Sequence, residues 1–408
     1  MASFIIGLIV LMFVLDLGFS LLNYSQRKKP LPDNVEGIYD EASYTKWLQY
    51  TMEKMRMELI GKTISVILMV GLLISGFFGI LETFSQSFSS NTILQTLIFL
   101  ACFMGIELLV SLPFEWIDTF KIEAKYGFNK TSVKIFWMDQ FKSLILGALL
   151  MAILVSVMMA LYQAFIDTLP LFILGLWLFI ALLMIVIYVL NTKVFVRLFN
   201  KLTPIEEGDL KDKIQALAKR SGFEVKAISV MDASKRSTKL NAFFSGLGKT
   251  REVVLYDTLI AKMTHEQILA VLAHELGHAK HRDTVRMLMI QILVFGLYAL
   301  GIGFVLKSPV LFTSFGLSEV SFGFAVILFS ILMEPLGLLI GIPVNALSRQ
   351  AETKADAYAV SMTDKKDMAE VLRILVTENF SNLNPHPYYV LLHYSHPPIA
   401  QRLKALDR

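Results

Sequence analysis

Val271-Leu-Ala-His-Glu-Leu-Gly-His278 is the stretch around which the chain is organised, and it places His274 and His278 four residues apart. On an α-helix this spacing brings both imidazoles to one face, about one turn apart. Two neutral imidazoles so placed can bind Zn²⁺, and the carboxylate of Glu275 beside them can take a proton from a zinc-bound water. The stretch therefore predicts a metal-binding helix.

The residues before this stretch favour a helix. Thr264 and Gln267 have the spacing of a capping box, and apolar residues follow at helical intervals. The competing interpretation is a chance pattern of histidines on an ordinary amphipathic helix.

Composition indicates a membrane protein. Of 408 residues, 55% are apolar and 18% are charged, and the mean hydropathy is +0.59. A soluble globular protein is less apolar, so we expect a polytopic protein in a lipid bilayer. The net charge is only +4, and we expect no nucleic-acid partner.

The supply of metal ligands is limited. Cys102, the only cysteine, lies within an apolar run, and all seven histidines lie in the C-terminal half. A disulfide framework and a thiolate zinc site are therefore excluded. Any metal must be bound by histidine and carboxylate.

Seven apolar runs are long enough to cross about 30 Å of hydrocarbon as helices. The first has no Lys or Arg ahead of it and no small-residue cleavage site after it, so we interpret it as an uncleaved membrane helix. The predicted spans are Phe4–Leu22, Thr63–Leu81, Thr92–Leu112, Ser143–Phe165, Leu171–Leu190, Met287–Leu306 and Val320–Ile342.

The connectors between these runs alternate between basic and non-basic without a break. By the positive-inside rule the N-terminus is outside, and the metal-binding helix and the C-terminus are cytosolic. Asp16, Glu107 and Glu334 fall within spans, so we expect each to face the interior of the bundle or to form an interhelical hydrogen bond.

The predicted organisation has four parts. Residues 1–192 hold five spans, residues 193–286 a cytosolic α+β segment with the metal-binding helix, residues 287–345 two further spans, and residues 346–408 a mostly helical tail. In the soluble segment, Leu210–Arg220 is predicted to be helical, and Val225–Met231 and Glu252–Tyr256 are predicted strands.

A third metal ligand is expected in the tail. Glu352 and Asp356 are four residues apart, on one helical face. Glu352 could complete a zinc site of three protein ligands, and Asp356 could accept the second N–H of a ligating histidine. Alternatively, the pair is only a solvated helix face. The long separation from His278 is explained if two membrane spans are inserted between the two helices.

Taken together, these features resemble the type I CAAX prenyl proteases, a family of integral-membrane zinc endopeptidases, over nearly the whole chain. The motifs that carry the resemblance are Lys125-Tyr-Gly-Phe-Asn-Lys130, Leu198-Phe-Asn-Lys-Leu-Thr-Pro204, Ser234-Lys-Arg-Ser237, Asn241-Ala-Phe243, Val254-Leu-Tyr-Asp-Thr258, His274-Glu-Leu-Gly-His278, Ser348–Asp356 and Tyr394-Ser-His-Pro-Pro398. The family fold is mainly α, with about seven transmembrane helices enclosing a water-filled chamber and a small cytosolic α+β zinc metalloprotease domain.

The resemblance implies one zinc ion per chain, bound by His274, His278 and Glu352, with Glu275 as general base and Asp356 behind the ligands. The substrate would be a polypeptide, prenylated or not.

It also implies roles for residues around the metal. Asn241, Ala242 and Phe243 would hold an extended peptide through main-chain hydrogen bonds. His396 would stabilise the oxyanion, and Arg402 would orient the carboxylates.

The chain departs from the family pattern in two places. Lys239 stands where many relatives have histidine, so the substrate role of that histidine is not expected here. The stretch Lys404-Ala-Leu-Asp-Arg408 lacks the dilysine signal of many eukaryotic relatives. We therefore expect a bacterial inner-membrane protein. Bacteria generally lack prenylated CAAX substrates, so the natural substrate could differ, and membrane protein quality control is one option.

Other classes remain as alternatives. A heat-shock membrane metalloprotease shares the His-Glu-x-x-His motif but lacks the long N-terminal region. Site-2-type proteases place that motif inside a span, and membrane di-iron hydroxylases need more histidines than this chain has. A non-catalytic chamber that binds polypeptides as a chaperone is the alternative from a different functional class.

Overall fold

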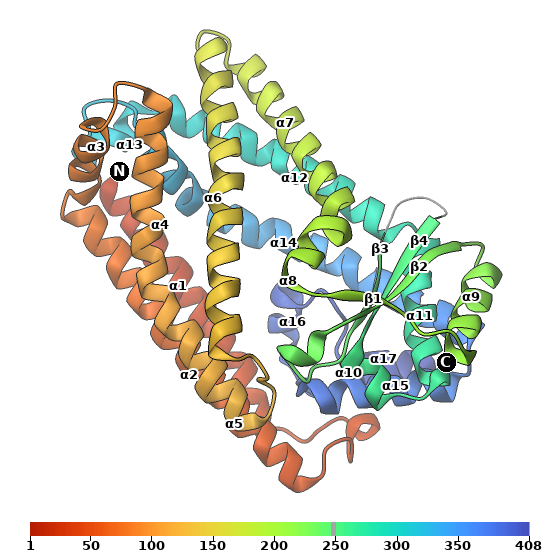
Figure 1. Cartoon of the computed structure of the whole chain (residues 1–408). Coiled ribbons are helices and arrows are strands. Elements are labelled where there is room, and N and C mark those ends of the chain that lie inside the picture. Colours follow the sequence, from red (N-terminus) through yellow and green to blue (C-terminus); the bar gives the residue numbers. More distant parts are fainter. Residues whose placement is uncertain (246–249, 408) are drawn as a thin grey trace.

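The computed structural model describes residues 1–245 and 250–407. Arg408, the last residue of the C-terminal stretch considered above, lies outside the described residues. The protein is mainly helical, with a membrane bundle on one side and a small sheet, covered by helices, on the other (Figure 1). The expected fold class is confirmed.

Seven helices among the described residues are long and apolar enough to cross a membrane, as predicted. They are α1 (Ala2–Ser25), α2 (Glu41–Ile74), α4 (Thr92–Ile117), α6 (Val133–Ala164), α7 (Leu169–Leu190), α12 (Asp283–Leu306) and α14 (Phe322–Met362). Short helices and turns between them are η1 (Gln26–Lys28), η2 (Asp33–Val35), α3 (Phe77–Gln86), η3 (Asp118–Glu123), α5 (Ala124–Tyr126), η4 (Asn191–Val196), α8 (Arg197–Phe199) and α13 (Pro309–Thr313).

The second span differs most from its predicted limits. Helix α2 begins at Glu41, where Asp40 caps it by accepting a hydrogen bond from the backbone N–H of Ser43. It ends at Ile74. Gly76, with a φ of 71°, precedes the separate helix α3, which begins at Phe77. A left-handed residue breaks a helix and glycine adopts it without strain, so the predicted end at Leu81 crosses a helix break.

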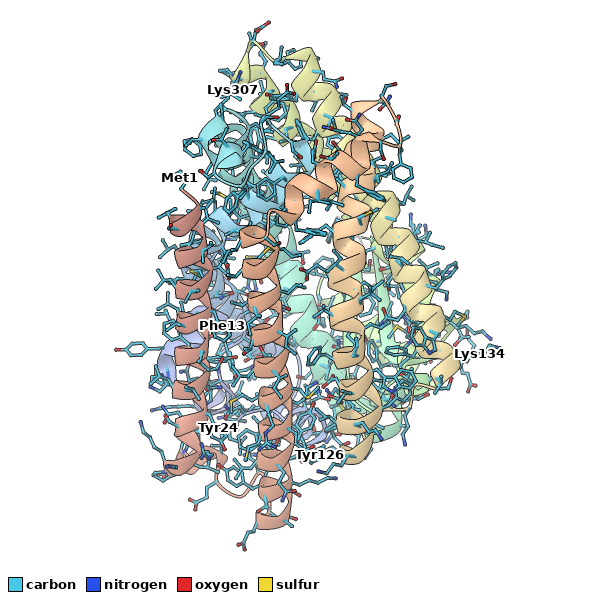
Figure 2. All side chains as sticks on the ribbon, turned by 90° about the vertical axis from the view of Figure 1, so that its left-hand side faces the viewer. Met1, Phe13, Tyr24, Tyr126, Lys134 and Lys307 are labelled. Carbon is cyan, nitrogen blue, oxygen red and sulfur yellow. The ribbon has the colours of Figure 1, made fainter. Side chains whose placement is uncertain are left out.

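The two ends of the bundle follow the predicted alternation. Met1 and Lys307 lie at one end, and Tyr24 and Tyr126 lie at the other, with Phe13 between (Figure 2). The basic connectors that follow Tyr24 and Tyr126 therefore share one side of the bundle.

The soluble unit is built on a four-stranded sheet of order β1-β2-β4-β3. Its strands are β1 (Leu202–Pro204), β2 (Glu224–Met231), β3 (Ala242–Ser245) and β4 (Thr250–Tyr256). Helix α9 (Asp209–Arg220) lies between β1 and β2 in the chain, η5 (Ala233–Lys235) lies between β2 and β3, and α10 (Asp257–Lys262) and α11 (His265–Lys280) follow β4. Strands β2 and β4 are parallel, whereas β1 and β3 pair antiparallel to their neighbours. Helix α9, β2 and β4 occur where the sequence predicts them.

Helix α14 connects the two regions. It runs without a break from Phe322 to Met362, through Pro335 and Pro343, and carries Glu352 and Asp356 in its last turns. The predicted boundary between residues 345 and 346 therefore falls inside one helix. Helices α15 (Lys365–Asn379), α16 (Pro387–His393) and α17 (Ile399–Leu406) complete the tail.

Two sequence motifs explain how the membrane region is fastened to the soluble unit. The loop after α5 meets the stretch after η5, where Lys130 donates its backbone N–H to the carbonyl of Arg236 over 3.0 Å. The Arg236 guanidinium in turn donates to both carboxylate oxygens of Asp139 in α6, over 2.8 and 3.1 Å. A bidentate pair of this kind fixes orientation as well as distance.

Candidate metal centre

Helix α11 is held at both of its ends and along one face. Thr264 and Gln267 form the predicted capping box. Ile268 and Leu272 are fully buried in the core of the soluble unit. At Gly277 the helix approaches α14 so closely that a Cβ there would lie 2.9 Å from the Cα of Ala355. The glycine between the two histidines therefore lets α11 lie directly against the helix that carries Glu352.

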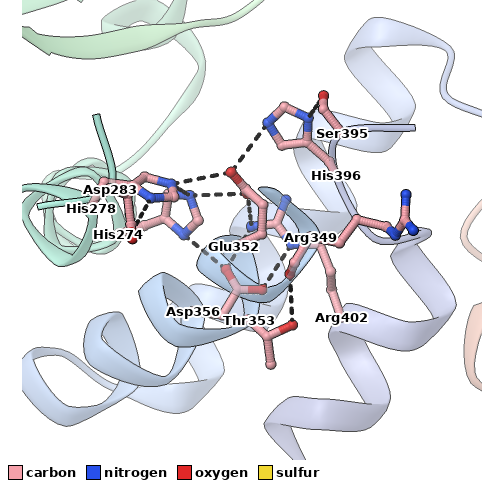
Figure 3. A network of polar contacts seen from close by, with 10 residues as sticks. All are labelled: His274, His278, Asp283, Arg349, Glu352, Thr353, Asp356, Ser395, His396 and Arg402. Carbon is pink, nitrogen blue, oxygen red and sulfur yellow. Dashed lines mark hydrogen bonds and ion pairs between the residues drawn. The ribbon is translucent and has the colours of Figure 1, made fainter. Parts of the chain in front are cut away.

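This contact brings three potential metal ligands together (Figure 3). His278 Nε2 lies 3.2 Å from His274 Nε2 and 3.2 Å from Glu352 Oε1, and His274 Nε2 lies 3.4 Å from Glu352 Oε2. The predicted third ligand is thus beside the histidine pair. Within the described residues, these three side chains form the group that could hold a metal ion.

The donor set fits a tetrahedral zinc ion. Ligand atoms about 2.0–2.1 Å from a tetrahedral centre are separated from one another by about 3.3 Å, which matches the spacing of these nitrogens and oxygens. In addition, the buried Glu352 Oε2 has no hydrogen-bond partner among the described residues. An unpaired buried carboxylate oxygen is costly, and a bound cation would satisfy it.

Carboxylates also lie behind both histidines. His274 Nδ1 is 2.9 Å from Asp356 Oδ1, although not in good hydrogen-bond geometry. Arg402 of α17 donates to both oxygens of Asp356, over 2.8 and 2.6 Å. His278 Nδ1 is 3.0 Å from Asp283 Oδ2, at the start of α12. The expected places of Asp356 and Arg402 beside the site agree with this geometry, whereas Asp283 was not predicted.

The electrostatics of the cluster follow from burial and neighbouring carboxylates. Burial lowers the pKa of His274, but the carboxylates of Asp356 and Glu352 outweigh it and raise the pKa to about 9. The pKa of His278 is also raised, because Glu352 outweighs burial there. Burial raises the pKa of Glu275, which favours a carboxyl group that can carry a proton.

His396 lies at the open side of the cluster, in the loop between α16 and α17. Its Nε2 is 3.3 Å from Glu352 Oε1, and 63% of its side chain is exposed. It lines a cavity of about 600 Å³ together with Arg402 and His393. The imidazole is therefore accessible from this cavity while it touches a metal-ligand candidate.

Asn241, Ala242 and Phe243 lie at and in the outermost strand of the sheet. Strand β3 pairs with β4 through one edge, with Ala242 opposite Leu255. No other strand in the described part of the chain pairs with the second edge of β3. A free edge offers unpaired backbone groups to an extended peptide.

Lys239, which departs from the family pattern, is directed toward the membrane region. Its Nζ lies 3.5 Å from Glu123 Oε2 and 5.0 Å from the centre of the Phe128 ring. It thus contacts side chains of the membrane region.

A second cavity, of about 480 Å³, lies between α1, α2 and α14. It is lined by Asp16, Glu334 and Lys62, and Lys62 Nζ is 2.7 Å from Asp16 Oδ2. His393 lines this cavity as well as the one beside His396. Two of the three charged residues predicted inside spans therefore face a hollow, whereas the environment of Glu107 stays a prediction.

Sequence analysis missed two residues of this site. Gly277 is part of the quoted stretch, and a glycine between two ligands on one helix could have suggested close helix packing. Asp283 follows a two-residue turn, His281-Arg282, so its contact with His278 depends on the direction in which α12 leaves α11. No residue pattern predicts that direction.

A cluster of this kind, formed between a helix of a small α+β unit and the end of a membrane helix, is typical of a membrane metallopeptidase. Residues 3–201 match the family model described as CAAX prenyl protease N-terminal, five membrane helices. Residues 204–408 match peptidase family M48. The chain belongs to this family, and it is a membrane metalloendopeptidase that acts on polypeptides.

Individual relatives extend the match over nearly the whole chain. The CAAX prenyl protease 1 homolog of Arabidopsis thaliana is 34% identical over 99% of this chain and 96% of its own length. The CAAX prenyl protease 1 of Saccharomyces cerevisiae is 31% identical over 95% of this chain and 92% of its own. The crystal structure of S. mikatae Ste24p superposes with a TM-score of 0.93 at 28% identity, over 100% of this chain and 99% of that one. These matches favour proteolysis over the non-catalytic chaperone alternative.

Proposed function

We propose that the protein is a zinc endopeptidase whose metal is held by His274, His278 and Glu352. The observation that carries the proposal is the convergence of two imidazole nitrogens and one carboxylate at tetrahedral spacing. Two nitrogens and one oxygen form a donor set typical of catalytic zinc with an open fourth position. When bound, the zinc ion acts as a Lewis acid that polarises the scissile carbonyl and acidifies the attacking water.

Glu275 is proposed as the general base. It follows His274 on α11, and burial raises its pKa, so it can take a proton from the attacking water and deliver it to the leaving amine. The nearby carboxylate of Asp356 is not free to act as the base, because Arg402 holds both of its oxygens. Arg402 thereby fixes the position of Asp356 behind His274.

His396 is proposed to donate to the oxygen of the scissile carbonyl as negative charge develops there. Its Nδ1 lies 2.9 Å from the Ser395 hydroxyl. A hydroxyl that donates to Nδ1 places the imidazole proton on Nε2, the nitrogen beside Glu352.

The substrate is proposed to bind as an added strand on the free edge of β3. Main-chain hydrogen bonds along this edge of the strand would hold a peptide whatever its side chains. Asn241 precedes the strand, and its side chain accepts a hydrogen bond from the backbone N–H of Ala242 over 2.8 Å, which fixes the beginning of that edge.

The relatives' names suggest a prenylated peptide as substrate. The two cavities lined by His393 of α16 supply a hollow in which a prenyl group could lie. The competing proposal is a quality-control peptidase for unmodified polypeptides. It is supported by β3, whose main-chain pairing does not depend on prenylation.

Cleavage of a farnesylated CAAX peptide should be compared with cleavage of its unprenylated twin by detergent-purified protein. The Glu275→Gln variant is the control, since it should keep zinc and lose about 10²–10⁴-fold in rate. Cleavage of the prenylated peptide alone supports a CAAX protease, and cleavage of both supports a general peptidase. Full activity of Glu275→Gln would exclude its role as base.

We further propose that the basic connectors and the metal site face the cytosol, because the connectors at that end are rich in Lys and Arg. A bacterial inner membrane stays a prediction. Labelling of single cysteines placed after Tyr24 and after Leu306 in a Cys102→Ala protein, with a membrane-impermeant reagent on intact cells, tests the orientation. Only the second position should react.

A further inference from the structure

Among the residues that the structure describes, Asp283 is the one carboxylate near the histidine pair that neither the sequence motifs nor the proposed reaction uses. Its side chain is 9% exposed, and its Oδ2 lies 3.0 Å from His278 Nδ1. It is the first residue of the membrane helix α12. Within the part of the chain that the structure describes, His278 is its side-chain partner.

We propose that Asp283 is a positioning residue for a metal ligand: its carboxylate orients His278 by accepting a hydrogen bond from the Nδ1–H of that imidazole. This inference rests on the proposed metal site. A proton held on Nδ1 leaves the lone pair of Nε2 free, and Nε2 is the atom directed at His274 and Glu352. Such carboxylates fix the tautomer and ring orientation of a ligating histidine.

The turn that precedes Asp283 explains how a membrane helix reaches the site. Only His281 and Arg282 separate α11 from α12. Arg282 has a φ of 57°, a left-handed conformation that is uncommon for a non-glycine residue. The turn places the Asp283 carboxylate beside the imidazole five residues earlier (Figure 3).

The two histidines are thus oriented from two different elements. His274 has Asp356 of α14 behind it, and that carboxylate is held by Arg402. His278 has Asp283 of α12, for which the described residues supply no cationic partner. The positions of two membrane helices, α12 and α14, therefore set the directions of the two histidines.

A purely structural role makes a different prediction. An acidic residue in the first turn of a helix stabilises it by about 0.3–1 kcal/mol through the helix dipole. Such a residue would affect folding stability but not metal affinity. Zinc affinity and the ligand field of the metal therefore separate the two roles.

The test compares Asp283→Ala, Asp283→Asn and the wild-type protein in detergent. Zinc affinity, measured by competition with a chromophoric chelator, should fall about 10–100-fold in Asp283→Ala. Asp283→Asn should lose less, because an amide oxygen can still accept from Nδ1–H. The visible absorption spectrum of the Co²⁺-substituted protein should shift in Asp283→Ala.

Asp209→Asn is the matched control. Asp209 Oδ2 lies 2.9 Å from His265 Nδ1 in an exposed pair on the same soluble unit, so this variant should bind zinc as the wild type does. Unchanged zinc affinity and an unchanged Co²⁺ spectrum in Asp283→Ala would overturn the inference and leave the metal site standing. A wild-type protein that binds no metal would instead overturn the proposed function.

If Asp283→Ala does not accumulate as folded protein, Asp283→Asn decides alone. Its weaker acceptor should still lower zinc affinity severalfold or shift the Co²⁺ spectrum. Wild-type values for both measurements would overturn the inference.

Discussion

The soluble unit and the membrane bundle are packed very differently. In α11, residues from more than one side of the helix are buried, including Ile268, Ala270 and Ala273 at 0% exposure. In α2, only 6% of the most apolar 18-residue stretch is buried within the protein. The bundle helices leave one face for lipid and contribute to cavities on another. The difference indicates that rigidity is concentrated where ligand atoms must be held at fixed spacing.

The largest expected effect of a single substitution is at the buried ion pair of Arg402 and Asp356. Arg402→Met removes the guanidinium that donates to both oxygens of the buried Asp356 carboxylate, and breaking a buried pair in this way typically costs about 3–5 kcal/mol. The melting temperature of the metal-free protein in detergent measures it. Lys213→Met, which breaks exposed pairs with Asp209 and Glu266, should cost at most about 1 kcal/mol. Equal losses in both variants would contradict the contrast.

The pH dependence of the metal-free protein should report the same buried network. The pKa of His274 is raised from 6.5 to about 9, so folding favours its protonated form. This stabilisation is fully present below pH 6.5 and is lost as pH rises through about 9. The melting temperature of chelator-treated protein should therefore decrease as the pH is raised from 6.5 to about 9.

The zinc-bound protein is the first control for this pH dependence, because a ligating imidazole is already neutral. His274→Gln should show a weaker dependence, because His278, whose pKa is also raised, still contributes to it. His265→Gln, at an exposed histidine, should retain the full dependence. A flat profile for the metal-free wild-type protein would count against the network.

Two glycines test packing in the two regions directly. Gly277→Ala would place a Cβ 2.9 Å from Ala355 Cα, and overpacking of this kind costs about 1–3 kcal/mol. Gly147 in α6 has no described atom within 4 Å of such a Cβ, so Gly147→Ala should leave stability unchanged or raise it by up to about 1 kcal/mol. The contrast is measured by the thermal unfolding and the zinc content of both variants. A Gly277→Ala protein with wild-type stability and zinc content would contradict it.

The smallest effect is expected inside the bundle. Lys62 pairs with Asp16 in the cavity between α1, α2 and α14. The Lys62 side chain is 41% exposed and the Asp16 side chain is 34% exposed. If water fills this hollow, the pair is screened and Lys62→Met should cost at most about 1 kcal/mol. A loss as large as that of Arg402→Met would show a dry bundle interior.

The sequence predicted all seven spans because each is an apolar run of sufficient length, but several helix limits differ. Helix α2 begins 22 residues before the predicted span because its first turns are polar and lie beyond the hydrocarbon. The prediction for α14 is wrong for a similar reason. Hydropathy falls after the apolar part of this helix, so the sequence predicts a boundary there, but the helix continues to Met362. Strands β1 and β3, with three and four residues, are too short to show alternation.

At the site, the spacing of His274 and His278 and the pairing of Glu352 with Asp356 predict residues that the structure brings together. These pairs lie on single helices, where sequence spacing determines the shared face. The place of His396 and Arg402 came from family resemblance alone. Asp283 was missed because its contact crosses the turn between two helices.

The most direct test of the central claim is the zinc content of purified wild-type protein and of Glu352→Ala, measured by atomic emission. Glu378→Ala, at a carboxylate that pairs with Lys262 on the surface, is the matched control. We expect about one zinc per chain in the wild-type and control proteins, and far less in Glu352→Ala. A Glu352→Ala protein that retains as much zinc as the wild type would contradict the proposed site.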